Sequence, residues 1–347
     1  MPSVRFYTIV QSLSGAAAAI AALAASAGDP GAVETLRSVA AVPPHIVGAL
    51  AEPAAFAAIP NGEMVVFDRR GHTLVAIDRE MSAARPIVQI GGEPGRILQP
   101  FGFDVDSEGL LIVGDAPNRQ ERVQVFTVTG SRLAGFWLPR RDDPRIQFEG
   151  LALNGVSSLH ATPRQTVLLS MPHTGALFAE YDYDGGEVRT IGRLRATPHD
   201  DDARVRLALN SGLPLAIPSG GYYFVFQTGE PRFRRYDAMG RLMYERVIQG
   251  RELDQWMAAQ PTTWPATSAH DTKSLPLVQL VVRDAALDRQ ESLWISLSVP
   301  FTYVYDASGE KRRTVQFKGA GEIRPSHLSF AADGRLLVTP GCYIFRP

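Results

Sequence analysis

The sequence predicts an all-β protein, a six-bladed β-propeller built from four-stranded antiparallel blades. Two observations carry this prediction: a hairpin pattern that recurs along the chain, and a turn signature that recurs between its copies. The 347 residues are 45% hydrophobic and 20% charged, which is the composition of a folded protein and excludes wholesale disorder. The single cysteine, Cys342, cannot form an internal disulfide, so packing alone must hold the core.

The hairpin pattern is clearest in three segments, residues 53–68, 100–115 and 325–338. Each starts with Pro, continues with alternating apolar residues, and turns at Gly62, Gly109 or Gly334. A second alternating segment follows each turn. Alternation with a period of two is typical of strands, and glycine supplies the positive φ that a tight hairpin turn needs. Each segment therefore predicts two antiparallel strands.

The turn signature consists of an aromatic residue, three mostly polar residues and a glycine. Its copies are residues 126–130, 181–185, 236–240 and 305–309. Each copy lies between two apolar runs. We therefore expect each of these turns to join the third strand of a blade to the fourth.

Together the two patterns predict six repeating units. The units begin near Pro53, Pro100, Phe148, Asn210, Leu275 and Pro325. Repeated four-stranded units are typical of a propeller, in which each blade buries its faces against its neighbours. The last unit has room for only three strands, and we expect the apolar segment 34–42 to supply the fourth. Such a closure leaves no unpaired sheet edge in the ring.

Residues 28–347 are assigned to the propeller, with insertions near residues 187–209 and 250–274. The first insertion is polar and contains His199 followed by three aspartates. The second starts with a helix-forming composition that stops at Pro261.

Residues 1–27 are predicted to be a signal peptide. A short start with Arg5 precedes an uncharged apolar stretch, residues 9–27, which ends in a small-x-small pattern before Gly28. The alternative is an N-terminal anchor that is retained, since the stretch is near the minimum length for crossing a bilayer. No other stretch is apolar enough to span a membrane. We therefore expect a secreted or periplasmic protein, or one anchored by this segment and facing outside the cytoplasm.

The units resemble the NHL-type repeat, which combines Pro, an apolar strand, Asp-Gly, a strand ending in Asp, and then Arg-Val-Gln-Val-Phe. Residues 100–130 match best, with Arg122 to Phe126 at the third-strand position. Six-bladed propellers of this kind include uncharacterised bacterial secreted proteins, sensor and adhesion domains, and enzymes such as lactonases and amidating lyases. The resemblance thus implies a fold, while the function must be found in a site.

In the families that the chain resembles, ligands bind at the channel face, where the loops that begin each blade meet the loops between second and third strands. On those loops we identify eight candidate ligand-binding residues: Arg69, Asp115, Asn118, Arg119, Glu149, His173, Asn210 and His327. All carry charged or hydrogen-bonding side chains. They are expected to surround one mouth of the channel.

A metal site is one hypothesis for this face. Asp115, Glu149 and Asn210 are oxygen donors that suit Ca²⁺, and lactonase-like propellers use such a set at the channel. The alternative is that Asp115 ends a strand and Glu149 caps a turn. No other cofactor is predicted.

Histidine and nucleophile motifs do not identify a catalytic site. The sequence has no zincin-like histidine pair and no Gly-x-Ser-x-Gly motif. His160, His173 and His327 belong to different units and could meet at the axis, as in amidating-lyase-like propellers that bind zinc. The alternative is that they are ordinary loop or surface histidines. Cys342 is expected to be a packed small residue.

The charge balance, 35 Lys and Arg against 36 Asp and Glu, gives no basis for binding nucleic acid. The function that we expect is a binding module, a monomer in which a rigid ring presents channel-face loops to a protein, peptide or glycan. The alternative is a metal-dependent hydrolase, lactonase-like, or a lyase that uses the same face. The residues leave open whether the protein is an enzyme.

Overall fold

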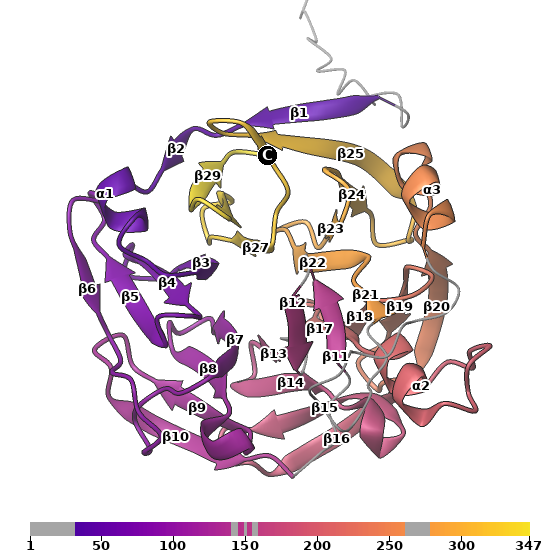
Figure 1. Cartoon of the computed structure of the whole chain (residues 1–347), viewed down its shortest axis with the longest axis horizontal. Coiled ribbons are helices and arrows are strands. Elements are labelled where there is room, and N and C mark those ends of the chain that lie inside the picture. The colour runs from indigo at the N-terminus through magenta and orange to yellow at the C-terminus, as the bar shows by residue number, and fades with distance from the viewer. Residues whose placement is uncertain (1–31, 140–144, 149–150, 155–158, 261–277) are drawn as a thin grey trace, which may run out of the picture.

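Six antiparallel four-stranded blades surround a central channel and form a closed ring (Figure 1). The computed structural model describes residues 32–139, 145–148, 151–154, 159–260 and 278–347, without the side chains of 145–148 and 151–154. The predicted signal peptide, residues 1–27, lies outside the described residues. The six-bladed propeller that the repeats predict is confirmed.

The strands of each blade follow one another from the channel outward. The first three blades are β3 (Pro53–Ala58), β4 (Met64–Asp68), β5 (Thr73–Ile77) and β6 (Ala84–Pro86); β7 (Pro100–Val105), β8 (Leu111–Asp115), β9 (Arg122–Phe126) and β10 (Arg132–Trp137); and β13 (Leu159–Ala161), β14 (Thr166–Ser170), β15 (Ala176–Asp182) and β16 (Glu187–Arg193).

The fourth and fifth blades are β17 (Gly212–Ala216), β18 (Tyr222–Phe226), β19 (Arg232–Tyr236) and β20 (Leu242–Val247); and β22 (Val282–Leu287), β23 (Leu293–Leu297), β24 (Thr302–Tyr305) and β25 (Lys311–Lys318), with the short β26 (Glu322–Ile323) beside β25. The sixth blade is β27 (His327–Phe330), β28 (Leu336–Thr339), β29 (Tyr343–Phe345) and, from the other end of the chain, β2 (Ala40–Ala41). Short helical turns are α1 (Pro44–Val47), η1 (Pro117–Arg119) and η2 (Pro172–Thr174).

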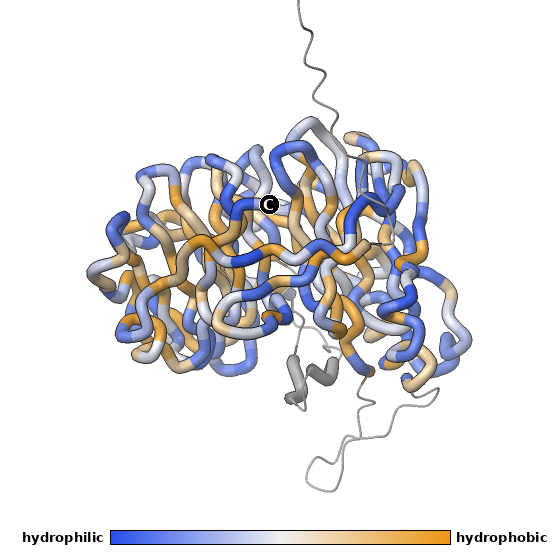
Figure 2. Tube along the Cα trace, turned by 90° about the horizontal axis from the view of Figure 1, so that it is seen from above, coloured by the Kyte–Doolittle hydropathy of each residue, from blue (hydrophilic) through white to orange (hydrophobic). Residues whose placement is uncertain are grey.

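The core lies between the blades. The second strand of each blade is buried over nearly its whole length, because a blade packs on both of its faces. Aromatic rings meet across these joints: Phe67 stacks on Phe103 of the next blade with centroids 5.6 Å apart. Phe317 and Phe345 meet edge to face at 4.9 Å between the fifth and sixth blades. Apolar residues accordingly gather inside the ring and polar residues at the loops (Figure 2).

The ring is closed by the N-terminal segment, as predicted for residues 34–42. β2 pairs antiparallel with β29, which gives the sixth blade its fourth strand. The same segment also contains β1 (Val33–Arg37), which pairs in parallel with β25 on the outside of the fifth blade. One stretch of chain therefore joins two neighbouring blades, which the sequence pattern did not predict.

The four aromatic–glycine turns join third to fourth strands, as predicted. Gly130 shows why the glycine is needed there. Its φ is +88°, and a Cβ at this position would lie 2.2 Å from the carbonyl oxygen of Ile87. The position therefore needs glycine both for its backbone conformation and for the space around it.

The third blade begins at Leu159, so the predicted start near Phe148 is wrong. Phe148 ends β11 (Arg145–Phe148), which forms an additional hairpin with β12 (Leu151–Asn154). β11 also pairs in parallel with β21 (Val278–Gln279), making a three-stranded sheet outside the six blades. Apolar alternation predicts an extended chain but does not specify which sheet a strand joins.

The region of the first expected insertion, near 187–209, starts with β16, the outer strand of the third blade, and ends in α2 (Ala203–Leu209). Asp202 caps α2, since its carboxylate accepts hydrogen bonds from the backbone N–H groups of Arg204 and Val205. The second, near 250–274, starts with α3 (Arg251–Ala258), and residues 261–277 lie outside the described residues. Among the helices of the described chain, none has the length and apolarity needed to cross a membrane.

The closure can be tested through Val42, which follows β2. Its side chain is 3% exposed and packs in the cluster that contains Ile46 and Ile344. Val42→Ala removes two buried methyl groups, so we expect a loss of about 1–3 kcal/mol in the free energy of unfolding by urea. Val39→Ala is the matched control, because Val39 is 56% exposed and should change stability little. Equal effects of the two variants would contradict a packed closure.

Candidate functional site

The inner strands of all six blades line one cavity of about 720 Å³ in the central channel. Cavities of this size suit small organic molecules. Part of the wall is apolar and includes Phe67, Phe101, Phe103 and Phe330. The rest carries charged and polar side chains that the apolar alternation of the inner strands would not require.

The first charged feature is a histidine–aspartate pair across the joint of the second and third blades. Nδ1 of His160, on β13, lies 2.9 Å from Oδ2 of Asp104 on β7. The backbone N–H of Ala161 donates to the same oxygen at 2.8 Å, and that of Val105 donates to Oδ1 at 2.8 Å. The carboxylate is thus fixed by three donors from two blades.

A second pair has the same construction at the joint of the fifth and sixth blades. Nδ1 of His327, the first residue of β27, lies 3.1 Å from Oδ2 of Asp284 on β22. The backbone N–H of Leu328 donates to that oxygen at 2.6 Å. In both pairs, an aspartate of one blade accepts from a histidine of the next blade and from the N–H that follows it.

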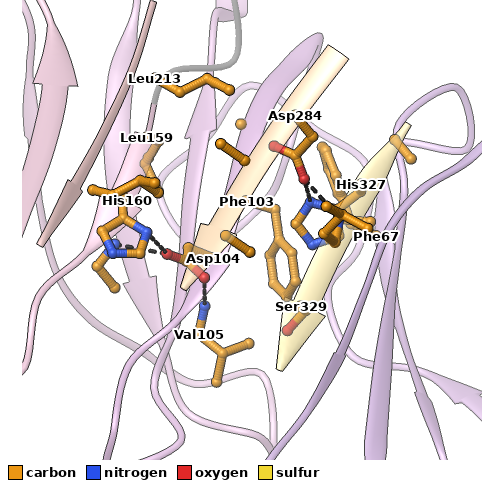
Figure 3. A pocket seen from close by; sticks show the side chains of 18 of the residues that line it. Phe67, Phe103, Asp104, Val105, Leu159, His160, Leu213, Asp284, His327 and Ser329 are labelled. Carbon is orange, nitrogen blue, oxygen red and sulfur yellow. Dashed lines mark hydrogen bonds and ion pairs between the residues drawn. The ribbon is translucent and has the colours of Figure 1, made fainter. Parts of the chain in front are cut away.

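The two pairs face each other. Their joints are three blades apart in a ring of six, which places them on opposite walls of the cavity. In Figure 3 they point inward from the two sides, with Phe103 between them in this view.

The two pairs also differ in depth. Asp106 and Asp288 hold equivalent turns at the ends of the inner strands β7 and β22. Asp104 lies two residues before its turn aspartate, whereas Asp284 lies four residues before its own. The second pair is therefore about 7 Å nearer the channel face along the strand direction.

These contacts determine which ring nitrogen of each histidine could accept a hydrogen bond from a ligand. A carboxylate only accepts hydrogen bonds, so Nδ1 of each ring carries the proton. Nε2 of a neutral ring is then an acceptor. Within the part of the chain that the structure describes, no residue hydrogen-bonds Nε2 of His160 or His327.

The surroundings shift the pKa of one group in each pair. Burial opposes the charged form of His327, but the charge and hydrogen bond of Asp284, helped by the more distant Asp104, raise its pKa. Burial likewise opposes the charge of Asp104, but His160 and the two backbone donors outweigh it and lower the pKa of that carboxyl. His327 is thus biased toward imidazolium and Asp104 toward carboxylate.

Two of the predicted residues, Arg69 and His327, line this cavity. Arg69 pairs with Glu52 at the mouth, and Arg283 and Gln227 also line the wall. Asn118 and Arg119 are exposed on η1, and His173 is half-buried on η2, outside the lining. Glu149 lies outside the described residues.

Asp115 is fully buried and holds the second blade together. Its carboxylate accepts from Nε and Nη2 of Arg122 at 2.7 and 2.9 Å and from the backbone N–H of Leu98 at 2.9 Å. Arg122 is 3% exposed and also donates to the carbonyl of Gly92. These contacts support a structural role for Asp115.

Asn210 is also fully buried. Its side-chain oxygen accepts from the backbone N–H of Arg195 at 2.8 Å, and its amide donates to the carbonyl of Arg206 at 2.9 Å. Among the described residues, no three His, Cys, Asp or Glu side chains are placed to hold a metal ion. The calcium hypothesis stays a prediction, and two of its three ligands, Asp115 and Asn210, already have other partners.

Sequence reasoning missed Asp104 and Asp284, and it considered His160 only as a zinc ligand or as an ordinary loop or surface histidine. A signal was present, since each is a charged or titratable residue inside an apolar inner strand. A polar side chain in such a position is more informative than an exposed one. Recognising the pairs requires knowing which inner strands are neighbours.

Structural comparison finds partial similarity to several solved proteins. The chain is similar to hydrazine synthase from Kuenenia stuttgartiensis, with 14% identity over 86% of this chain and 96% of that chain and a TM-score of 0.49. It is similar to a gluconolactonase from Xanthomonas campestris, with 15% identity over 84% of each chain and a TM-score of 0.48. Virginiamycin B lyase from Staphylococcus aureus gives 11% identity over 82% and 76%, with a TM-score of 0.48.

At these identities and TM-scores the similarity carries no inference about this chain. No protein-family model and no curated protein matches the chain. The NHL family that the repeats resemble is therefore not confirmed, while the arrangement of six blades rests on the strand pairing described above.

The structural role of Asp115 can be tested with Arg122→Gln. The substitution leaves a buried carboxylate without its counter-charge, so we expect a loss of about 3–5 kcal/mol in unfolding free energy. Arg241→Gln is the control, because Arg241 is 80% exposed in its pair with Asp237 and should matter little. If Arg122→Gln is as stable as the control, Asp115 is available for a ligand role.

The raised pKa of His327 can be measured by NMR titration of its ring signals. We expect a midpoint above the ordinary histidine value of about 6.5, and a midpoint below it in Asp284→Asn, where burial dominates. Because folding raises this pKa, the stabilisation is present below about pH 6.5 and is lost as the pH rises through the folded-state value. The exposed His45 serves as the internal control. An unchanged midpoint in Asp284→Asn would contradict the ion pair.

Proposed function

We propose that the protein is an enzyme that binds a small organic molecule in the central channel and moves protons on it. His160 and His327 are the acid–base groups in this proposal. The observation that supports it most is the pair of matched histidine–aspartate contacts on opposite walls of one cavity. An oriented imidazole with a free Nε2 is the group most often used for general acid–base catalysis.

The bias in protonation suggests the roles. His327, whose pKa is raised by Asp284, is the proton donor, and His160, oriented by Asp104, is the acceptor. In this scheme His160 Nε2 removes a proton from carbon next to a carbonyl, and the C–H electron pair forms a double bond. The bond to a leaving group on the neighbouring carbon breaks, and that group takes the proton of His327. The reaction class is a lyase, or an isomerase if the proton returns to carbon.

The same contacts also join neighbouring blades, because each aspartate accepts a backbone N–H of the next blade. Variants of these residues can therefore change stability as well as activity. Glutamine removes the acid–base function of either histidine, because its amide does not titrate near neutral pH, and it keeps a polar side chain of similar length.

The second candidate is a binding module for a protein, peptide or glycan, as a secreted or periplasmic monomer. It is supported by charged groups at the mouth of the cavity, the Arg69–Glu52 pair and Arg283. In that function the histidine–aspartate pairs are blade joints only. Elemental analysis of the purified protein tests whether calcium or zinc belongs to either function.

A panel of lactones, 2-oxo acids and 3-hydroxy esters in D₂O tests the enzyme. We expect protein-dependent deuterium incorporation or elimination with at least one compound by NMR, reduced about 10²–10⁴-fold in His160→Gln and in His327→Gln. His45→Gln is the matched control, since His45 is exposed and far along the chain from both strands. Saturable binding of a panel compound without exchange, equal in all variants, would favour the binding module.

A further inference from the structure

A second cavity, of about 590 Å³, lies between the fifth and sixth blades. It is formed near the turns that follow β22 and β27, at the end of the inner strands away from His327. Its lining is rich in arginine and includes two aspartates and two aromatic rings: Arg289, Arg313, Arg335, Arg346, Asp288, Asp333, Trp294 and Phe330.

The two aspartates are already engaged. The carboxylate of Asp288 accepts from Nε1 of Trp294 at 2.9 Å and from two backbone N–H groups of its own turn. Asp333 pairs with Arg335, whose Nε lies 2.6 Å from Oδ2. Asp333 thus compensates the charge of Arg335, whereas the donors to Asp288 are uncharged.

The arginines are only partly compensated. Arg313 pairs with Glu34 of β1 at 2.8 Å and lies over the ring of Trp294, 5.0 Å from its centroid. Arg289 and Arg346 have no carboxylate within ion-pair distance in the described chain. With Glu34 included, the four guanidinium groups outnumber the three carboxylates of Asp288, Asp333 and Glu34.

Guanidinium groups gathered around one cavity repel each other, and an anion between them removes that repulsion. Arginine matches the planar, bidentate geometry of phosphate, sulfate and carboxylate groups. The size of the cavity admits a small molecule that carries such a group. Trp294, 1% exposed, and the half-buried Phe330 supply an apolar wall.

We propose that this cavity is an oxyanion-binding site for a small molecule bearing phosphate, sulfate or carboxylate groups. It is separate from the channel and independent of the reaction proposed there. Phe330 lines both cavities and packs edge to face on Trp294 with centroids 5.5 Å apart, so it forms the wall between them.

The test is isothermal titration calorimetry with pyrophosphate, sulfate and citrate, which represent phosphate, sulfate and carboxylate groups. Each titration is done at 20 and at 150 mM salt, where the electrostatic screening length is about 20 and about 8 Å. We expect saturable binding of at least one probe at one site. The double variant Arg289→Gln/Arg346→Gln should weaken it at least tenfold. The control double variant Arg79→Gln/Arg251→Gln removes the same charge from exposed positions outside the cavity. Its affinity for the probe should stay within twofold of the wild type.

Two results would overturn the site: no saturable binding by any probe, or equal weakening in both double variants, which would indicate only a general charge effect. His160→Gln and His327→Gln should bind the probes like the wild type. Loss of channel activity with intact oxyanion binding, or the reverse, therefore separates this site from the proposed reaction.

Discussion

One constraint underlies the structure: a four-stranded sheet cannot bury both of its faces by itself. Each blade must pack between two others, so the ring must close, and the N-terminal segment completes it through β2 and β1. Closure removes the free edge of the sixth blade and fixes the relative positions of all inner strands. The channel cavity and the cavity between the fifth and sixth blades both depend on those positions.

The histidine–aspartate pairs illustrate how such a ring positions chemistry. Each aspartate accepts a hydrogen bond from the backbone of the neighbouring blade and from a histidine of that blade. The aspartate therefore fixes the orientation of the imidazole. A residue that acts in a site is most useful when rigid elements hold it, and here the elements are inner strands. The contact that joins the two blades engages Nδ1, so Nε2 is the ring nitrogen without a hydrogen-bond partner among the described residues.

Much of the fold could be predicted from the sequence because its determinants are local. Alternating residues and turn glycines such as Gly130 specify strands and connections within a blade. The start of the third blade was missed because pairing between β11 and β21 joins segments far apart in the chain. The site was predicted in part: His327 was identified, but its partner Asp284 belongs to another blade, and only the closed ring brings the two together.

The opposite placement of the two pairs has a consequence for substrate selection. The gap between the histidines is not set by any loop but by three blade-to-blade packings on each side of the ring. A volume change in a remote core contact, such as the stacked Phe178 and Phe224 rings, would alter the spacing of the pairs without touching either. Substrate width in such a channel would thus evolve through hydrophobic cores, while the polar residues of the cavity stay the same.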